Sequence, residues 1–157
     1  MSVLIYIEAF LFIICISLSG FFSSSEVAII SISRAKVRSL LAQGKKGANA
    51  LNALKQDIDH TLITILIGNN VVNVLAASVA TAIALQIYGE PGIGIATFVT
   101  IILMLIIGEI GPKTYAARHT EKLALKLAGP IHILNKIFTP LLWIWDKIKS
   151  RWGSGFA

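Results

Sequence analysis

The sequence predicts an all-α membrane protein with three transmembrane helices. Hydrophobic residues make up 55% of its 157 residues and charged residues only 14%, and the mean hydropathy is +0.78. Two apolar stretches reach the roughly 20 residues that a helix needs to cross a bilayer, and a third, shorter one ends in the motif "GEIGPK". This composition is typical of a membrane domain and not of a soluble globule.

The first span is expected over 3–32, and its most apolar part carries one charge, Glu8. A cleaved signal peptide is the competing interpretation, but it requires basic residues ahead of the apolar core. The first basic residue is Arg34. We therefore expect the segment to remain as a membrane helix.

The segment after the first span is expected to form a cytoplasmic helical hairpin, because Ala and Leu recur at helical spacing on both sides of a turn at Gly44–Gly47. The second span is expected over 61–87 with Asp59 as its N-cap. An external turn, "YGEPG", then leads to the third span at 92–109.

The third span is expected to be broken near Gly108–Pro112, with Gly111 and Pro112 as a hinge. Proline cannot donate a hydrogen bond to the carbonyl four residues back, here that of Gly108, and its ring pushes that carbonyl aside. A freed carbonyl beside the carboxylate of Glu109 outlines a cation site. Interrupted membrane helices of this kind commonly line ion pockets.

The C-terminal part, 113–152, is expected to form amphipathic juxtamembrane helices with Trp143, Trp145 and Trp152 as interfacial anchors. A fourth span is disfavoured because charges and two prolines interrupt the segment. Residues 1–152 are thus predicted to be one transmembrane domain, and 153–157 a tail or linker remnant.

The charge distribution predicts the orientation. The N-terminus and the "YGEPG" turn contain none of the 14 basic residues, which all follow the first span or the third. The positive-inside rule places the N-terminus outside and the C-terminus in the cytoplasm of a multi-pass cell-membrane protein. This asymmetry and attraction to anionic lipid account for the net charge of +6, so nucleic-acid binding is disfavoured.

Polar residues recur on one face of each span. Ser19 and Ser23 lie four apart on the first helix, Asn69 and Asn73 four apart on the second, and Glu109 closes the third. At about 1.5 Å per residue, all of them fall in the inner half of a ~30 Å core. Hydroxyl, amide, carboxylate and carbonyl oxygens suit hard cations such as Mg²⁺, Ca²⁺ or Na⁺.

Each group also has a purely structural interpretation. Serines and glycines often serve close helix packing, and asparagines often bridge helices. Glu109 is the firmest functional candidate, because an ionisable group at membrane depth is costly. Three polar neighbours are weaker candidates: Ser24, Asn70 and Glu26.

The motifs "LSGFFSSSEVA", "LIGNNVVN" and "GEIGPKTYAARH", in this order and spacing, resemble the DUF21 transmembrane domain of the CNNM/CorC family of magnesium transporters. The resemblance covers nearly the whole chain. Ser24 departs from it, since similar proteins often have glycine there.

The resemblance implies a homodimer that exports Mg²⁺ with Na⁺ as the coupling ion. Carried over to this sequence, it implies an ion site at Ser19, Ser23, Asn69, Asn73 and Glu109 with the Gly108 carbonyl. It also implies cytoplasmic CBS-type modules in a longer parent protein, which this sequence does not contain.

Two other function classes compete with a carrier. One is a membrane anchor or Mg²⁺ sensor that does not transport and that supports cytoplasmic regulatory modules. The other is an intramembrane enzyme, which would need a base near a nucleophile. It is disfavoured because no His or Lys lies at the depth of the serines. We therefore expect a protein that is not an enzyme.

Overall fold

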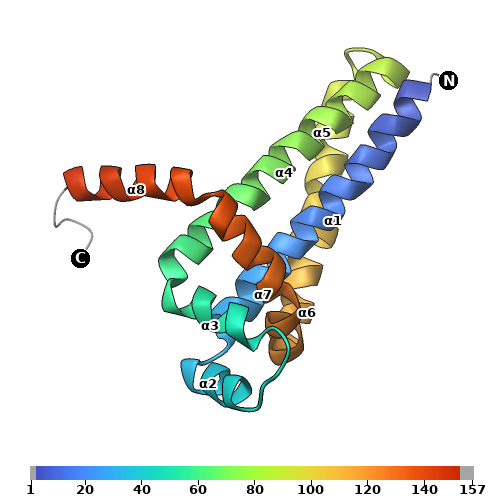
Figure 1. Cartoon of the computed structure of the whole chain (residues 1–157). Coiled ribbons are helices and arrows are strands. Elements are labelled where there is room, and N and C mark those ends of the chain that lie inside the picture. The colour runs from blue at the N-terminus through green and yellow to red at the C-terminus, as the bar shows by residue number, and fades with distance from the viewer. Residues whose placement is uncertain (1–2, 153–157) are drawn as a thin grey trace.

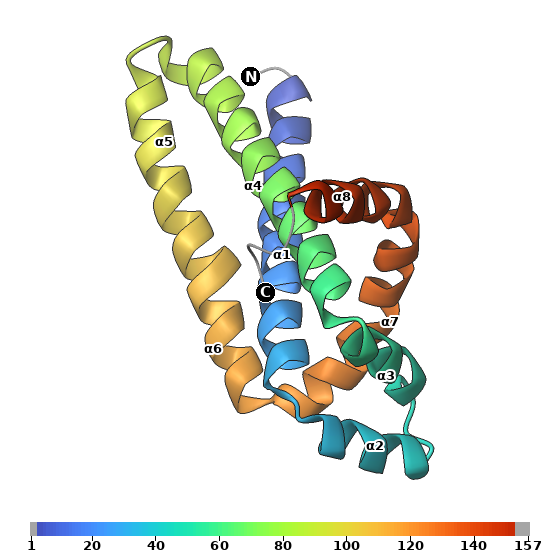
Figure 2. The ribbon, with the colours of Figure 1, turned by 90° about the vertical axis from the view of Figure 1, so that its left-hand side faces the viewer.

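The computed structural model describes residues 3–152, and in this range the chain forms helices and no strands (Figure 1). Three long helical stretches lie side by side as an elongated bundle (Figures 1 and 2). They are α1 (Val3–Ser31), α4 (Ile58–Tyr88), and a continuous third stretch composed of α5 (Gly92–Leu103), the π-helical segment η1 (Met104–Ile110) and α6 (Gly111–Arg118). The expected fold class is confirmed.

The bundle presents apolar side chains outward. In the most apolar window of each long helix only 11%, 33% and 17% of the residues are buried within the chain, in the order α1, α4 and the third stretch. Ile13, Val74 and Phe98 are each more than 60% exposed. A surface of this kind needs a hydrocarbon environment, which identifies the chain as a multi-pass membrane protein.

The third span differs from the expected interruption at 109, because it continues as one helix to Arg118. A π-helical turn accommodates the proline: the Gly111 N–H donates to the Ile106 carbonyl, five residues back. Pro112 directly follows this wider turn, as the second residue of α6. The wider turn replaces the break.

The helical hairpin forms as expected from α2 (Arg34–Ala42) and α3 (Ala48–Gln56), and its cytoplasmic placement stays a prediction. The hydroxyl of Ser33 caps α2 by accepting the Lys36 N–H at 3.1 Å. Gly47 precedes α3 at φ +87°, and a side chain there would collide with the backbone of Leu125. This close approach fixes the hairpin against α7 (Thr120–Ile137).

The best-packed core lies at the end of the bundle opposite the α4–α5 turn, where α1, α2, α3, α4 and α7 converge (Figure 2). Its largest aliphatic side chains are each at most 1% exposed: Ile29, Leu40, Leu51, Leu54, Ile65 and Ile131. Burial of a side chain of this size contributes about 1.5–3 kcal/mol. This core therefore holds these ends of the spans together.

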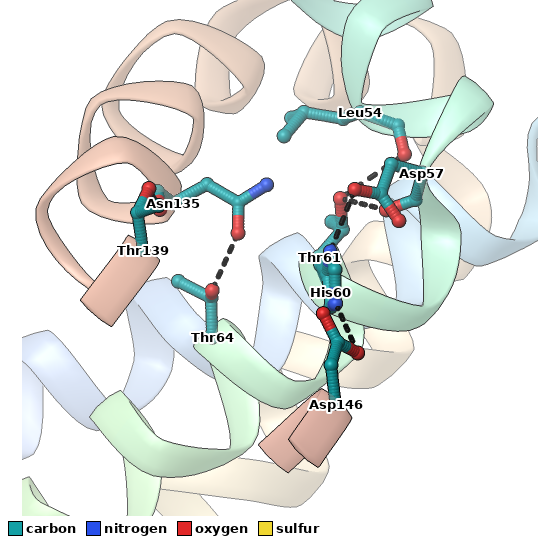
Figure 3. A network of polar contacts seen from close by, with 8 residues as sticks. All are labelled: Leu54, Asp57, His60, Thr61, Thr64, Asn135, Thr139 and Asp146. Carbon is teal, nitrogen blue, oxygen red and sulfur yellow. Dashed lines mark hydrogen bonds and ion pairs between the residues drawn. The ribbon is translucent and has the colours of Figure 1, made fainter. Parts of the chain in front are cut away.

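Helix α4 begins at Ile58, three residues earlier than expected, so the prediction that Asp59 caps it is wrong. Asp59 lies within the first turn, and Asp57 is the residue before the helix. The Thr61 hydroxyl donates to the carbonyls of Leu54 and Asp57 and ties this turn to α3 (Figure 3).

Helix α8 (Thr139–Arg151) turns away from α7 at a bend of 68°. By length and composition alone this bent pair could be a fourth span, and the interfacial placement of the two helices stays a prediction. The imidazole of His60 links α8 to α4, with Nδ1 2.8 Å from Asp57 Oδ2 and Nε2 3.0 Å from Asp146 Oδ1 (Figure 3). Nearby, the Thr64 hydroxyl donates to Asn135 Oδ1 at 2.6 Å.

We expect Asp146→Ala to loosen α8, because His60 then keeps only its contact within the α4 turn. Amide hydrogen exchange in α8 should become faster while exchange in α1 stays unchanged. Ser150→Ala is the matched control, since its hydroxyl bonds only within α8. Equal exchange in the two variants would show that the bridge does not hold α8.

Candidate cation site

The centre of the candidate site is the hydroxyl of Ser19, which is fully buried on α1. Three acceptor oxygens surround it: Asn69 Oδ1 at 3.2 Å, Asn73 Oδ1 at 2.9 Å and the Gly108 carbonyl at 3.4 Å. These oxygens come from α4 and η1. The structure thus brings together polar groups of all three spans.

A serine hydroxyl has one proton and can donate it to one acceptor at a time. At least two of the three facing oxygens therefore meet Ser19 without a proton between them. Asn69 and Asn73 are half-buried, and acceptor oxygens gathered in this way favour a donor or a cation that satisfies them. The arrangement is electronegative and suited to a small hard cation.

Asn73 connects this cluster to the carboxylate. Its Oδ1 faces Ser19 and its Nδ2 donates to Glu109 Oε1 at 3.4 Å. Glu109 lies on η1 and is half-buried, so the single negative charge stands at the margin of the oxygen cluster. A cation between them would be partly neutralised by this carboxylate.

Gly108 lets the third span approach Ser19. A Cβ at this position would stand 2.9 Å from the Ser19 Oγ, so any larger residue would displace the hydroxyl. The Gly108 carbonyl, which the sequence analysis marked as a candidate ligand, can therefore come close to α1 because Gly108 has no side chain.

Ser23 lies one turn further along α1 and is fully buried. Its Oγ is the one buried side-chain oxygen or nitrogen without a hydrogen-bond partner among the residues that the structure describes. Such a group is rare in folded proteins and costs about 1–3 kcal/mol. Since Ser19 and Ser23 share a helix face, this free oxygen is a further candidate ligand.

The three weaker candidates do not join the cluster. The Ser24 hydroxyl donates to the Gly20 and Phe21 carbonyls of its own helix. Asn70 is exposed on another face of α4. Glu26 lies 3.3 Å from Lys113 Nζ and joins α1 to α6.

Residues 10–153 match the model of a protein family described as the cyclin M transmembrane N-terminal domain. The chain belongs to this CNNM family. The resemblance seen in the three sequence motifs is therefore confirmed.

Bacterial relatives support the same assignment. The chain is 42% identical to a UPF0053 protein of Haemophilus influenzae, over 84% of this chain and 31% of the relative. It is 34% identical to the UPF0053 inner membrane protein YfjD of Escherichia coli, over 83% of this chain and 31% of the relative. It is 32% identical to the UPF0053 protein sll1254 of Synechocystis, over 95% of this chain and 43% of the relative. The chain spans between 31% and 43% of the length of these relatives.

Two close contacts in this CNNM domain were missed by the sequence reasoning. A Cβ on Gly68 would stand 2.4 Å from the ring of Phe22, so α1 and α4 touch there through a glycine. A Cβ on Gly20 would stand 3.2 Å from Pro112 Cγ. The pattern of glycines in the spans signals close packing in general, but it does not name the partners.

We expect Gly68→Ala to destabilise the domain by about 1–3 kcal/mol, because the aromatic ring of Phe22 has to shift to admit the methyl group. The thermal midpoint of the purified protein in detergent measures this effect. Gly94→Ala is the matched control, since nothing lies within 4 Å of a Cβ at that helical position. Similar midpoints for the two variants would contradict the close α1–α4 contact.

Proposed function

We propose that this CNNM domain binds Mg²⁺ between α1, α4 and η1 and exports it across the membrane, with Na⁺ as the coupling ion. The observation that carries the proposal is the buried hydroxyl of Ser19, which faces three acceptor oxygens within 3.4 Å. Mg²⁺ prefers oxygen ligands and is commonly held by one or two carboxylates together with waters. The resemblance to CNNM/CorC transporters supports Mg²⁺ over the other hard cations.

In this proposal, Ser19, Asn69, Asn73 and the Gly108 carbonyl present oxygens to the ion, and Ser23 adds its free hydroxyl. Glu109 supplies the negative charge. A site with one carboxylate binds a divalent ion only moderately, which a carrier needs because the ion must also leave. Gly111 and Pro112, after the π-helical turn, are the proposed hinge.

The proposed orientation has the N-terminus outside and α2, α3 and α7 in the cytoplasm, as the positive-inside rule predicts. A homodimer would cover part of the apolar surface that the chain leaves exposed. Because the relatives are longer than this chain, we propose that cytoplasmic modules of the CBS type follow it in the parent protein.

The length of the relatives also favours a second candidate, a membrane anchor or Mg²⁺ sensor for such modules. Mg²⁺ flux into or out of proteoliposomes, with and without a Na⁺ gradient, separates the two. A carrier moves Mg²⁺, and a coupled carrier responds to the gradient. Folded protein that binds Mg²⁺ without any flux would establish the anchor or sensor instead.

We expect Asn73→Ala and Glu109→Gln each to weaken Mg²⁺ binding by about tenfold or more, since metal sites lose this much even when an outer contact is removed. Isothermal titration of the purified protein with Mg²⁺ measures the effect. Asn70→Ala and Glu90→Gln are the matched controls, because both residues are exposed outside the cluster. Unchanged affinity in the cluster variants would show that Mg²⁺ is bound elsewhere or not at all.

We expect Ser23→Ala to separate ion binding from packing. The variant removes a buried hydroxyl that has no partner, so its thermal midpoint without Mg²⁺ should equal or exceed that of the parent protein. Mg²⁺ should then raise the midpoint by less than it does in the parent. A lower midpoint without Mg²⁺, combined with an unchanged Mg²⁺ shift, would assign Ser23 to packing.

A further inference from the structure

A second polar site lies apart from the cation site, in a pocket of about 360 Å³ between α2 and α3. Three basic side chains line it, Arg34 and Arg38 from α2 and Lys55 from α3. The carboxamides of Asn52 and Gln56 complete its polar lining. No carboxylate is among its lining residues in the part of the chain that the structure describes.

Among the described residues, the three basic groups have no acidic partner. Within residues 3–152, no ion pair of 4 Å or less involves Arg34, Arg38 or Lys55. Four carboxylates at this end of the molecule are engaged elsewhere: Glu26 with Lys113, Glu121 with Lys36, and Asp57 and Asp146 with His60. A fifth, Asp59, does not line the pocket. The pocket therefore gathers positive charge that the chain does not neutralise.

Lys55 is fixed in this position by α1. Its Nζ donates to the carbonyls of Ile29 at 2.8 Å and Ile30 at 3.2 Å, which leaves one of its three N–H groups free. Burial and then the positive charge of Arg34 lower the pKa of Lys55. An anion in the pocket would offset both effects.

The lining matches a phosphate group. Arg34 and Arg38 lie four residues apart and project from one face of α2. Guanidinium groups match phosphate oxygens with paired N–H donors, while amide and ammonium groups add single ones. The pocket adjoins the carbonyls of Ile29 and Ile30, so it lies beside the last turn of α1, where that span leaves the membrane.

We propose that this pocket binds a phosphate-bearing anion at the cytoplasmic end of α1. The ligand chemistry is the same for the headgroup of an anionic phospholipid and for a soluble phosphate compound. Basic pockets on the cytoplasmic side of membrane proteins commonly hold such headgroups. The site is independent of the proposed Mg²⁺ site, since the two share no residue.

The test compares two double variants of equal charge. Arg34→Gln/Arg38→Gln removes the two guanidinium groups from the pocket. Lys45→Gln/Lys46→Gln removes the same charge from the exposed α2–α3 turn, which does not line the pocket. Native mass spectrometry of each protein in detergent, titrated with phosphatidylglycerol and separately with inorganic phosphate, measures the binding.

We expect the pocket variant to bind the phosphate-bearing probe about tenfold or more weakly than both the parent and the turn variant, because charge-assisted hydrogen bonds are lost. Tight binding of phosphatidylglycerol that inorganic phosphate does not displace identifies a lipid headgroup. Binding of inorganic phosphate alone identifies a soluble ligand. Equal binding by the two double variants, or no binding of either probe to the parent, overturns the proposal.

Discussion

The fully buried Ser19 hydroxyl stands where the three spans meet, and one proton cannot satisfy the three oxygens that face it. The hydrocarbon region of a membrane holds no water that could donate the missing hydrogen bonds to these oxygens. Such a cluster persists because the surrounding packing holds it or because a cation occupies it. The close contacts at Gly68 and Gly108 position this cluster, and the Gly108 carbonyl on η1 faces the Ser19 hydroxyl.

The two halves of the molecule have different physical roles. The part of the bundle next to the α4–α5 turn is sparsely buried within the chain. The opposite end is tied to α2, α3 and α7 by a well-packed core. The proposed transport by alternating access would use this difference, because the candidate site lies between the two parts.

Sequence reasoning predicted the all-α fold class, the three spans and the residues that meet at the cluster. Helical spacing and depth in the membrane can both be worked out from the positions of residues along the chain. The same reasoning misplaced the start of α4, because the helix begins directly after Asp57, whose carboxylate contacts His60. It expected a break at Pro112, whereas a π-helical turn preserves the span. The Gly68–Phe22 contact depends on how two helices far apart in sequence pack, which no local pattern encodes. The basic pocket depends on how α2 and α3 fold back on each other and on the contact of Lys55 with α1.

We propose that a small hard cation binds where Ser19, Asn69, Asn73 and the Gly108 carbonyl meet. Mn²⁺ shares the oxygen preference of Mg²⁺ and can be located by anomalous diffraction from crystals of the protein. We expect an anomalous peak within coordination distance of Ser19 Oγ and the Asn73 side chain, and no such peak in crystals of Asn73→Ala. A peak elsewhere in the wild-type protein, with this cluster empty, would contradict it.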